Sequence, residues 1–367
     1  MYIWQQPRWP EFSWDARTLA SPLADTHKEQ GRLLGRMEAL GFESRSDARL
    51  LALTQEVTKS SEIEGETLDA DQVRSSIARR LGLDIAGLVP SDRHVDGAVE
   101  VVLDATQNFH EPLTRERMFT WHTTLFPTGG RGMKTIRVGA WRNDDTGPMQ
   151  VVSGPIGRER VHFEAPPASQ LENEMSRFLE WFNEPAEADP LLHASLAHLW
   201  FVTIHPFNDG NGRIARAVAD MALARAENST QRYYSMSAQI RAERNDYYRE
   251  LESAQKATLD ITRWHAWFLG CLLRAVTGAQ EQLGAVLDKA RFWERVAREP
   301  LNERQILVLN RVLDDGFEGK LTTSKWAKLA KCSQDTAYRD ILDLLERGAL
   351  VKNPEGGRST SYSLAVV

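Results

Sequence analysis

The sequence predicts a mainly α-helical protein with a small β-hairpin and a winged helix-turn-helix unit at its C-terminal end. Apolar residues recur at helical spacing through most of the chain. Glycines and prolines cluster between residues 127 and 148, with short strand patterns around them. From residue 301 onward the pattern is helix, helix, turn, helix and hairpin, which is the winged-helix order.

The composition excludes several classes of protein. The 367 residues are 42% hydrophobic and 26% charged, with a net charge of −6, so no basic surface for nucleic acid extends over the whole chain. The two cysteines, Cys271 and Cys332, lie far apart within apolar helical patterns, which favours buried thiols over a metal site or a disulfide. The N-terminus does not resemble a secretory signal. The sequence contains no uninterrupted apolar stretch of about eighteen residues, the length that a membrane span needs. We therefore expect a cytoplasmic protein without membrane contact.

Three segments follow from these patterns. Residues 1–88 form an N-terminal helical region, residues 89–288 a central domain and residues 289–367 the winged-helix domain, with charged residues 288–300 as the linker. Prolines in the first 26 residues delay the first helix, which is expected over 25–40 and ends at Gly41. The tryptophans of this region are interpreted as packing anchors.

A β-hairpin is expected over residues 136–152. Alternating apolar residues at 136–140 predict one strand, and 149–152 predict the other. Residues 143–148, Asn-Asp-Asp-Thr-Gly-Pro, form the turn.

The chemistry is concentrated in residues 205–216, His-Pro-Phe-Asn-Asp-Gly-Asn-Gly-Arg-Ile-Ala-Arg, ahead of a helical pattern. Gly210 and Gly212 permit a turn into the N-terminus of that helix, where backbone N–H groups and the helix dipole favour an anion. Arg213 and Arg216 lie on one face and can hold phosphate oxygens. His205 can accept a proton from an attacking hydroxyl.

Asp209 adds a hard oxygen ligand of the kind that Mg²⁺ uses together with phosphate and water. The alternative interpretation is a glycine-interrupted surface loop, which does not explain why so many chemically active residues share it. No Gly-Lys-Ser/Thr follows the glycines, so this is not a Walker A loop.

This stretch resembles the His-Pro-Phe-x-Asp-Gly-Asn-Gly-Arg-x-x-Arg signature of the Fic domain family at every defining position. The resemblance implies a helical enzyme that transfers AMP from ATP to a protein hydroxyl and releases pyrophosphate. It implies that His205 is the base and that Asp209 holds Mg²⁺. The phosphate-binding residues would be the following: Gly210, Asn211, Gly212, Arg213 and Arg216.

The resemblance extends to two further segments. The 136–152 hairpin looks like the family's flap, where a target segment presenting a Tyr, Thr or Ser hydroxyl would pair with the main chain. Tyr247, Tyr248 and Gln255 look like residues of the nucleoside pocket, although aromatic residues at this spacing also occur in ordinary cores.

Ser60-Ser61-Glu62-Ile63-Glu64-Gly65 matches the family's inhibitory pattern, Ser/Thr-x-x-x-Glu-Gly/Asn. Ser60 and Glu64 are one helical turn apart, so both can face one site. The resemblance implies that Glu64 pairs with an arginine otherwise free for the γ-phosphate, expected to be Arg213. The enzyme would then rest in an inhibited state with ATP bound unproductively.

The C-terminal unit presents Ser333, Gln334, Thr336 and Arg339 on its expected recognition helix. From residue 301 onward ten Lys/Arg face nine Asp/Glu, a near-neutral balance that disfavours strong DNA binding. A protein contact or a homodimer is the favoured alternative.

Three functions compete at this point. The first is a self-inhibited protein adenylyltransferase, and the second is a regulator or antitoxin-like protein that acts through the winged helix without catalysis. The third retains the enzyme but changes the donor nucleotide or adds removal of AMP. The intact motif favours the first.

Overall fold

The computed structural model describes residues 1–38, 40, 42–83, 87–131, 134–145, 147–155, 158, 160–296, 301–313, 317, 319–354 and 360–365. The chain separates into two compact units, Met1–Ala279 and Gln280–Val367, and each is described by itself. The predicted boundaries at residues 88 and 288 stay predictions.

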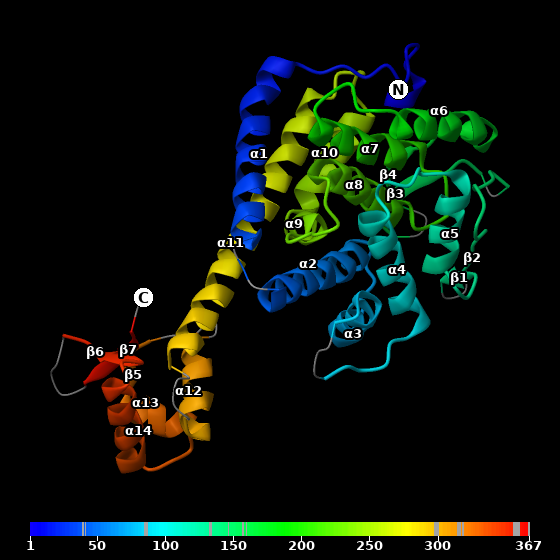
Figure 1. Ribbon diagram of the computed structural model, residues 1–367. Helices are drawn as coiled ribbons and strands as arrows, with labels where there is room; N and C mark the ends of the chain where they lie inside the picture. The colour runs from blue at the N-terminus through cyan, green and yellow to red at the C-terminus, as the bar shows by residue number, and fades with distance from the viewer. Residues whose placement is uncertain are drawn as a thin grey trace. The chain divides into compact units, whose positions relative to one another are not determined.

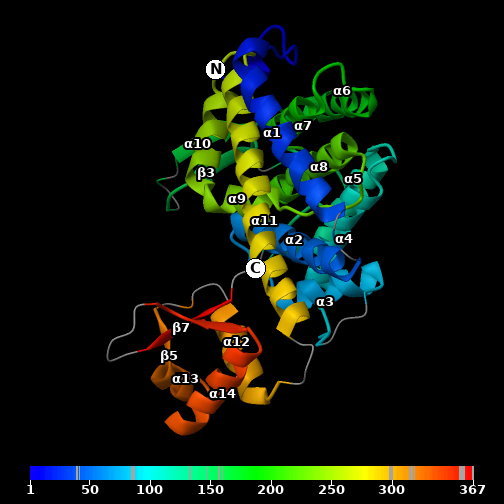
Figure 2. The ribbon, with the colours of Figure 1, turned by 60° about the vertical axis from the view of Figure 1, so that its left-hand side comes forward.

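Helices build the first unit, as the sequence predicts (Figures 1 and 2). In chain order its α-helices and short 3₁₀ helices are η1 (Ile3–Gln5), α1 (Ala16–Glu38), α2 (Phe42–Ile63), α3 (Ala70–Leu81), α4 (Arg93–Gln107), α5 (Arg115–Leu125), η2 (Ala168–Gln170), α6 (Leu171–Asn183), α7 (Pro190–Ile204), α8 (Asn211–Glu227), α9 (Met236–Ala242), α10 (Arg244–Gln255) and the start of α11 (Thr262–Val296). Asp69, Asp92 and Thr114 cap α3, α4 and α5 by accepting hydrogen bonds from backbone N–H groups of the first turn.

Helices α7 and α8 form the centre of this unit and pack extensively against each other. Residues 194–204 of α7 are all buried, which fits a helix that is apolar on every side. Helices α2, α4 and α5 also contact α8. The loop between α7 and α8 is residues 205–210, so the core fixes the position of the predicted motif from both sides.

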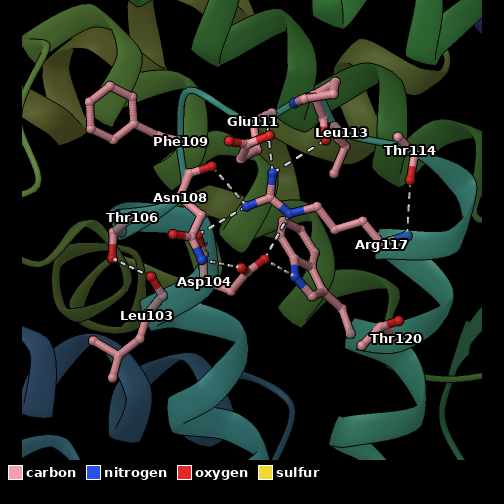
Figure 3. A network of polar contacts seen from close by, with 12 residues as sticks. Leu103, Asp104, Thr106, Asn108, Phe109, Glu111, Leu113, Thr114, Arg117 and Thr120 are labelled. Carbon is pink, nitrogen blue, oxygen red and sulfur yellow. Dashed lines mark hydrogen bonds and ion pairs between the residues drawn. The ribbon is translucent and has the colours of Figure 1, made fainter. Parts of the chain in front are cut away.

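Arg117 of α5 secures the C-terminal end of α4 (Figure 3). Its Nε donates to Asp104 Oδ2 at 2.7 Å, and its Nη2 donates to the carbonyls of Asp104 and Asn108 at 3.0 and 3.1 Å. Trp121 Nε1 donates to the same Asp104 oxygen at 2.7 Å. Carbonyls at a helix end have no partner within the helix, and a cation there complements the dipole. This network holds α5 against α4.

The predicted hairpin exists but lies later than 136–152: the strand predicted over 149–152 is confirmed in β3 (Gln150–Ser153), whereas the strand predicted over 136–140 is wrong. Residues 136–145 form loop and turn, and β3 pairs with β4 (Arg160–Glu164) instead. Phe163 is buried, whereas Val161 and Val152 are exposed, so the hairpin packs against the core at its Phe163 end. A second, shorter pair joins β1 (Gly130–Arg131) to β2 (Lys134–Thr135). The alternation of Val161 and Phe163 with polar residues is the sequence signal for β4.

The first helix starts earlier than predicted. α1 begins at Ala16 and includes Pro22 as its seventh residue, so this proline does not delay the helix. Proline supplies no N–H to the carbonyl one turn before it, a cost that packing in a long helix can exceed. The predicted stop at Gly41 lies outside the described residues. Among the tryptophans, Trp4 and Trp9 act as packing anchors, donating to the Glu164 carbonyl at 2.7 Å and the Glu174 carboxylate at 2.8 Å.

The second unit contains the predicted order of elements. It holds the end of α11, then α12 (Glu303–Leu313), β5 (Leu321–Thr322), α13 (Thr323–Leu329), α14 (Gln334–Glu346), β6 (Leu350–Lys352) and β7 (Ser361–Leu364). The strands form a sheet in the order β5-β7-β6, and Trp326, Ile341 and Leu344 lie in the core.

The predicted linker over 288–300 is helical as far as Val296, because Phe292 and Val296 pack into the core of the second unit. Residues 297–300 lie outside the described part. Within the ranges that the structure describes, no helix has both the length and the apolar composition needed to cross a membrane.

Candidate active site

His205 follows the last residue of α7 in a left-handed conformation, with φ of 54°. Its Nδ1 lies 3.2 Å from the Val202 carbonyl, which only accepts, so Nδ1 carries the proton and Nε2 remains as the acceptor. Burial lowers the pKa of His205 to about 4, because desolvation disfavours the charged imidazolium. The side chain is therefore neutral at pH 7 and has the tautomer that a general base requires.

Three side chains brace the loop that follows. The Asn211 amide donates to the Phe207 carbonyl at 2.8 Å and accepts from its N–H at 2.9 Å. His122 Nε2 lies 3.2 Å from the Asp209 carbonyl, and its ring stacks on Phe207 at a centroid distance of 4.2 Å. Arg142 Nε donates to the His205 carbonyl at 2.8 Å. Because the Asn211 side chain is occupied here and buried, its contribution to an anion site comes from its backbone N–H.

The N-terminus of α8 has no capping side chain of its own. Gly210 is the N-cap in a left-handed conformation, with φ of 80°, and makes no side-chain cap bond to the helix. A Cβ at Gly210 would lie 2.8 Å from the Phe126 ring, so both conformation and space require glycine there. This combination gives the first turn of α8 a positive end without a capping side chain.

Asp209 suits a magnesium ion. One of its carboxylate oxygens, Oδ1, accepts from the Gly210 N–H at 2.6 Å, which fixes the orientation of the side chain. Mg²⁺ in phosphate sites commonly takes one or two carboxylates and completes its shell with water and phosphate. Among the described residues no group of three or more His, Cys, Asp or Glu side chains forms a metal cage. A single oriented carboxylate beside an anion site is the donor set that such an ion fits.

The two motif arginines contact the last turn of α2 and the segment that follows it. Arg216 Nη2 donates to Glu64 Oε1 at 2.9 Å and to the Ser60 carbonyl at 2.8 Å, and its Nε donates to Ser60 Oγ at 2.9 Å. Arg213 Nη1 donates to Glu66 Oε2 at 2.8 Å. The expected Glu64–Arg213 pair is therefore wrong. One helical turn after Arg213, Arg216 lies against the last turn of α2, whereas Arg213 faces the segment beyond it.

Glu64 also covers the start of α8. A Cβ at Gly212 would lie 2.0 Å from Glu64 Oε1, so the carboxylate rests directly on this glycine. Gly65, with φ of 77°, lies two residues beyond the end of α2, and the Glu66 N–H donates to the Ser61 carbonyl at 3.0 Å. This turn reverses the chain and brings Glu64 and Glu66 to different arginines.

A cavity of about 990 Å³ joins these parts. Glu64, His205 and Gly212 line it together with β3, β4 and α10. Tyr247, Tyr248 and Gln255 also line it, as expected of a nucleoside pocket. Tyr247 is buried, with its hydroxyl 3.0 Å from His198 Nε2, and the Gln255 amide donates to Thr203 Oγ1 at 3.3 Å.

Sequence reasoning missed His122, Arg142 and Glu66. His122 lies among apolar residues of α5 and looks like an ordinary core histidine. Arg142 belongs to the segment interpreted as a strand and turn. Glu66 lies just outside the six-residue pattern. The sequence signal for it is a second carboxylate two residues after Glu64.

Two family models match parts of this chain, and together they include the residues of the candidate site. The sequence model of the Fic/DOC family matches residues 112–223, which include the whole 205–216 loop, and that of a domain of unknown function (DUF4172) matches residues 2–83. The chain is a Fic/DOC family protein. In this Fic/DOC protein the DUF4172 segment contains Glu64, and the Fic/DOC segment contains the two arginines.

Curated relatives of this Fic/DOC protein are distant. The chain is 25% identical over 256 residues to the protein adenylyltransferase Fic of Culex quinquefasciatus, covering 65% of this chain and 47% of that protein. It is 24% identical over 260 residues to the protein of the same name from Drosophila willistoni, covering 64% and 47%. The chain thus spans about half the length of these relatives.

Two solved structures share the fold. A Fic family protein from Desulfovibrio desulfuricans G20 superposes with a TM-score of 0.55 at 22% identity, covering 97% of this chain and 98% of that one. A Fic domain containing signaling protein from Bacteroides thetaiotaomicron VPI-5482 gives 0.53 at 20% identity, covering 71% and 97%. The predicted Fic-type helical fold is confirmed.

Proposed function

We propose that this protein is a self-inhibited protein adenylyltransferase, which transfers AMP from ATP to a Tyr, Thr or Ser hydroxyl of a target protein or of itself. One observation carries the proposal. A neutral histidine with Nε2 as its acceptor lines the same cavity as the uncapped start of α8, whose next turn presents two arginines. Attack of a hydroxyl on a phosphate ester requires a base and an anion site in one cavity, and the cations of Arg213 and Arg216 lie on the same helix as that anion site.

In the proposed reaction His205 Nε2 accepts the proton of the target hydroxyl. The hydroxyl oxygen forms a bond to the α-phosphorus of ATP, and the bond from that phosphorus to the bridging oxygen breaks. Pyrophosphate leaves with the bonding electrons. The first N–H groups of α8 and the guanidinium groups of Arg213 and Arg216 stabilise the phosphate charge.

Asp209 would hold Mg²⁺, which would neutralise part of the charge on the phosphates. Tyr247, Tyr248 and Gln255 would bind the nucleoside, since they line the same cavity on the α10 side. The hairpin β3–β4 borders the cavity, so an extended target segment could pair with a free strand edge there.

The resting state has both arginines occupied. Glu64 neutralises Arg216 and covers Gly212, where phosphate would approach, while Glu66 engages Arg213. A bound ATP therefore meets a carboxylate where its terminal phosphates need cations. A preference of about 2.7 kcal/mol for this state would hold about 99% of molecules inactive.

Labelled ATP tests the transferase. The Glu64→Gly variant, incubated with Mg²⁺ and ATP labelled at the α- or the γ-phosphate, should become labelled only by the α-phosphate nucleotide. His205→Ala in the same background should lose at least about a hundredfold in rate. Retention of γ-label would indicate phosphoryl transfer, and equal α-labelling in the His205→Ala control would remove His205 from its role. Repeating the assay with each nucleoside triphosphate identifies the donor.

For the second unit we propose a protein contact, such as a homodimer, in preference to DNA binding. Gln334 and Arg339 are exposed on α14, but the near-neutral charge from residue 301 onward offers little phosphate attraction. Tight, sequence-selective gel shifts by the full chain would reverse this preference.

A further inference from the structure

A serine, a histidine and a glutamate are aligned on the hairpin and α10, outside the 205–216 loop. Ser153 Oγ of β3 lies 2.6 Å from His162 Nε2 of β4. His162 Nδ1 lies 2.8 Å from Glu252 Oε2 of α10. A nucleophile, a base and an orienting carboxylate thus follow one another within hydrogen-bond distance. Proteins activate a hydroxyl with this geometry.

The partners fix the direction of each proton. A carboxylate only accepts, so the neutral imidazole of His162 carries its proton on Nδ1 and donates to Glu252. Nε2 is then the acceptor, and Ser153 donates its hydroxyl proton to it. The serine oxygen is left with its lone pairs available for attack.

Glu252 is held ionised. Its other oxygen, Oε1, accepts from Lys256 Nζ at 2.6 Å and lies 3.3 Å from Arg160 Nη2. The hydrogen bond from Lys256, aided by that of His162, lowers the pKa of Glu252 to about 2. The carboxylate can therefore orient the imidazole and stabilise its protonated form across the neutral pH range.

The three residues face the proposed nucleotide site. Ser153, His162 and Glu252 all line the 990 Å³ cavity that His205 and Gly212 also line. Ser153 is exposed, so a ligand in that cavity has access to its hydroxyl. The electrophile that the proposed function places in this cavity is the α-phosphorus of a nucleoside triphosphate.

We propose that Ser153 is an activated nucleophile that accepts the nucleotidyl group in cis, with His162 as its base and Glu252 as a positioning residue. This inference rests on the proposed function for its electrophile. Ser153 Oγ forms a bond to the α-phosphorus, and the bond to the bridging oxygen breaks. Pyrophosphate leaves with the electron pair, and the hydroxyl proton moves to His162 Nε2.

The first test measures the reactivity of Ser153 in the absence of ATP. A fluorophosphonate probe should label Ser153 of the full chain, and peptide mass spectrometry locates the label. Ser253 is the matched comparison, because it lines the same cavity beside Glu252. Both ring nitrogens of His162 are engaged by Ser153 and Glu252, so His162 does not activate Ser253. His162→Ala and His162→Gln should each slow labelling of Ser153 by about a hundredfold. Labelling of Ser153 no faster than that of Ser253, or unchanged in both His162 variants, overturns the proposal.

Glu252 is tested by partial rescue. Glu252→Ala should slow labelling, while Glu252→Gln, which keeps an acceptor oxygen for the imidazole, should recover part of the rate. Equal rates in the two variants would contradict a positioning role.

The second test uses ATP. In the Glu64→Gly background with Mg²⁺ and ATP, peptide mapping should find AMP on Ser153, and His162→Ala should reduce that adduct while AMP on other positions persists. AMP elsewhere but not on Ser153 overturns this inference and leaves the transferase standing. No AMP on any peptide, with probe labelling of Ser153 intact, contradicts the transferase and with it the assignment of AMP to Ser153.

Discussion

His205 shows how burial adjusts one residue to its chemistry. The Val202 carbonyl fixes its tautomer, and desolvation keeps it uncharged. The same burial makes it a weaker base than a free imidazole, so the positive start of α8 has to contribute much of the rate by stabilising the phosphates.

This arrangement predicts the pH dependence of transfer. A base works only when neutral, and the pKa of His205 is lowered to about 4, so activity should stay level from neutral pH down to about 5 and fall through pH 4. The measurement is kcat/KM of the Glu64→Gly variant against pH. A decrease in kcat/KM with a midpoint near pH 6.5, the pKa of an unperturbed histidine, would contradict the claim that burial lowers the pKa of His205.

Gly212 reports on the position of Glu64. Gly212→Ala should destabilise the wild-type chain by about 1–2 kcal/mol, because the new Cβ would lie 2.0 Å from Glu64 Oε1 and displace it from Arg216. In the Glu64→Gly background the same change should stabilise the protein by about 0.5–1 kcal/mol, since alanine is favoured over glycine within a helix. Urea unfolding of the four proteins measures the sign change. If Gly212→Ala changed the free energy of unfolding in the same direction in both backgrounds, Glu64 would not lie against Gly212.

At the scale of elements, the proposed inhibition depends on the segment that follows α2. Its left-handed Gly65 reverses the chain after Glu64 and presents Glu66 to Arg213. Two carboxylates two residues apart thus reach two arginines three residues apart on α8.

Glu66 should therefore weaken ATP binding even when Glu64 is absent. In the Glu64→Gly background, Glu66→Gln should lower KM for ATP about fivefold, which corresponds to about 1 kcal/mol for a part-buried ion pair. Glu62→Gln is the matched control, because Glu62 pairs with Lys59 at 2.6 Å rather than with a motif arginine. Equal KM values for the Glu66 and Glu62 variants would exclude a second contact of this kind.

The elements also show where sequence reasoning succeeds. Helices α3, α4 and α5 were predictable because Asp69, Asp92 and Thr114 are local capping signals that need no tertiary partner. The hairpin was placed wrongly because Ile136 and Val138 alternate like a strand, while strand pairing depends on which segments meet in space. The Glu64 pattern was visible, but its arginine was misassigned, because the choice between Arg213 and Arg216 depends on how α2 packs against α8.

At the scale of the whole molecule, two compact units divide the chain at residues 279 and 280, and the predicted catalytic and inhibitory residues all belong to the first. That unit contains histidines whose pKa burial lowers to about 3 or 4, namely His122, His193, His198, His205 and His265.

These histidines predict how stability depends on pH. Each is neutral when folded and would take up a proton near pH 6.5 when unfolded, so the unfolded chain binds more protons between pH 6.5 and 4. The free energy of unfolding should therefore decrease as pH falls through this window, by about 1 kcal/mol for each histidine by pH 5.5. Burial raises the pKa of Asp220 and Glu227, which offsets part of the loss. Urea midpoints at pH 7.5 and 5.5 test this, and a higher midpoint at pH 5.5 would contradict it.

The central claim is that Glu64 holds an intact adenylyltransferase inactive. The direct measurement is the initial rate of AMP incorporation, followed by intact-protein mass spectrometry, for the wild type, Glu64→Gly and Glu64→Gly with His205→Ala. We predict that Glu64→Gly is about a hundredfold faster than the wild type and that the His205 change returns the rate to background. Equal rates in wild type and Glu64→Gly, with the His205 variant inactive, would show an enzyme that Glu64 does not restrain.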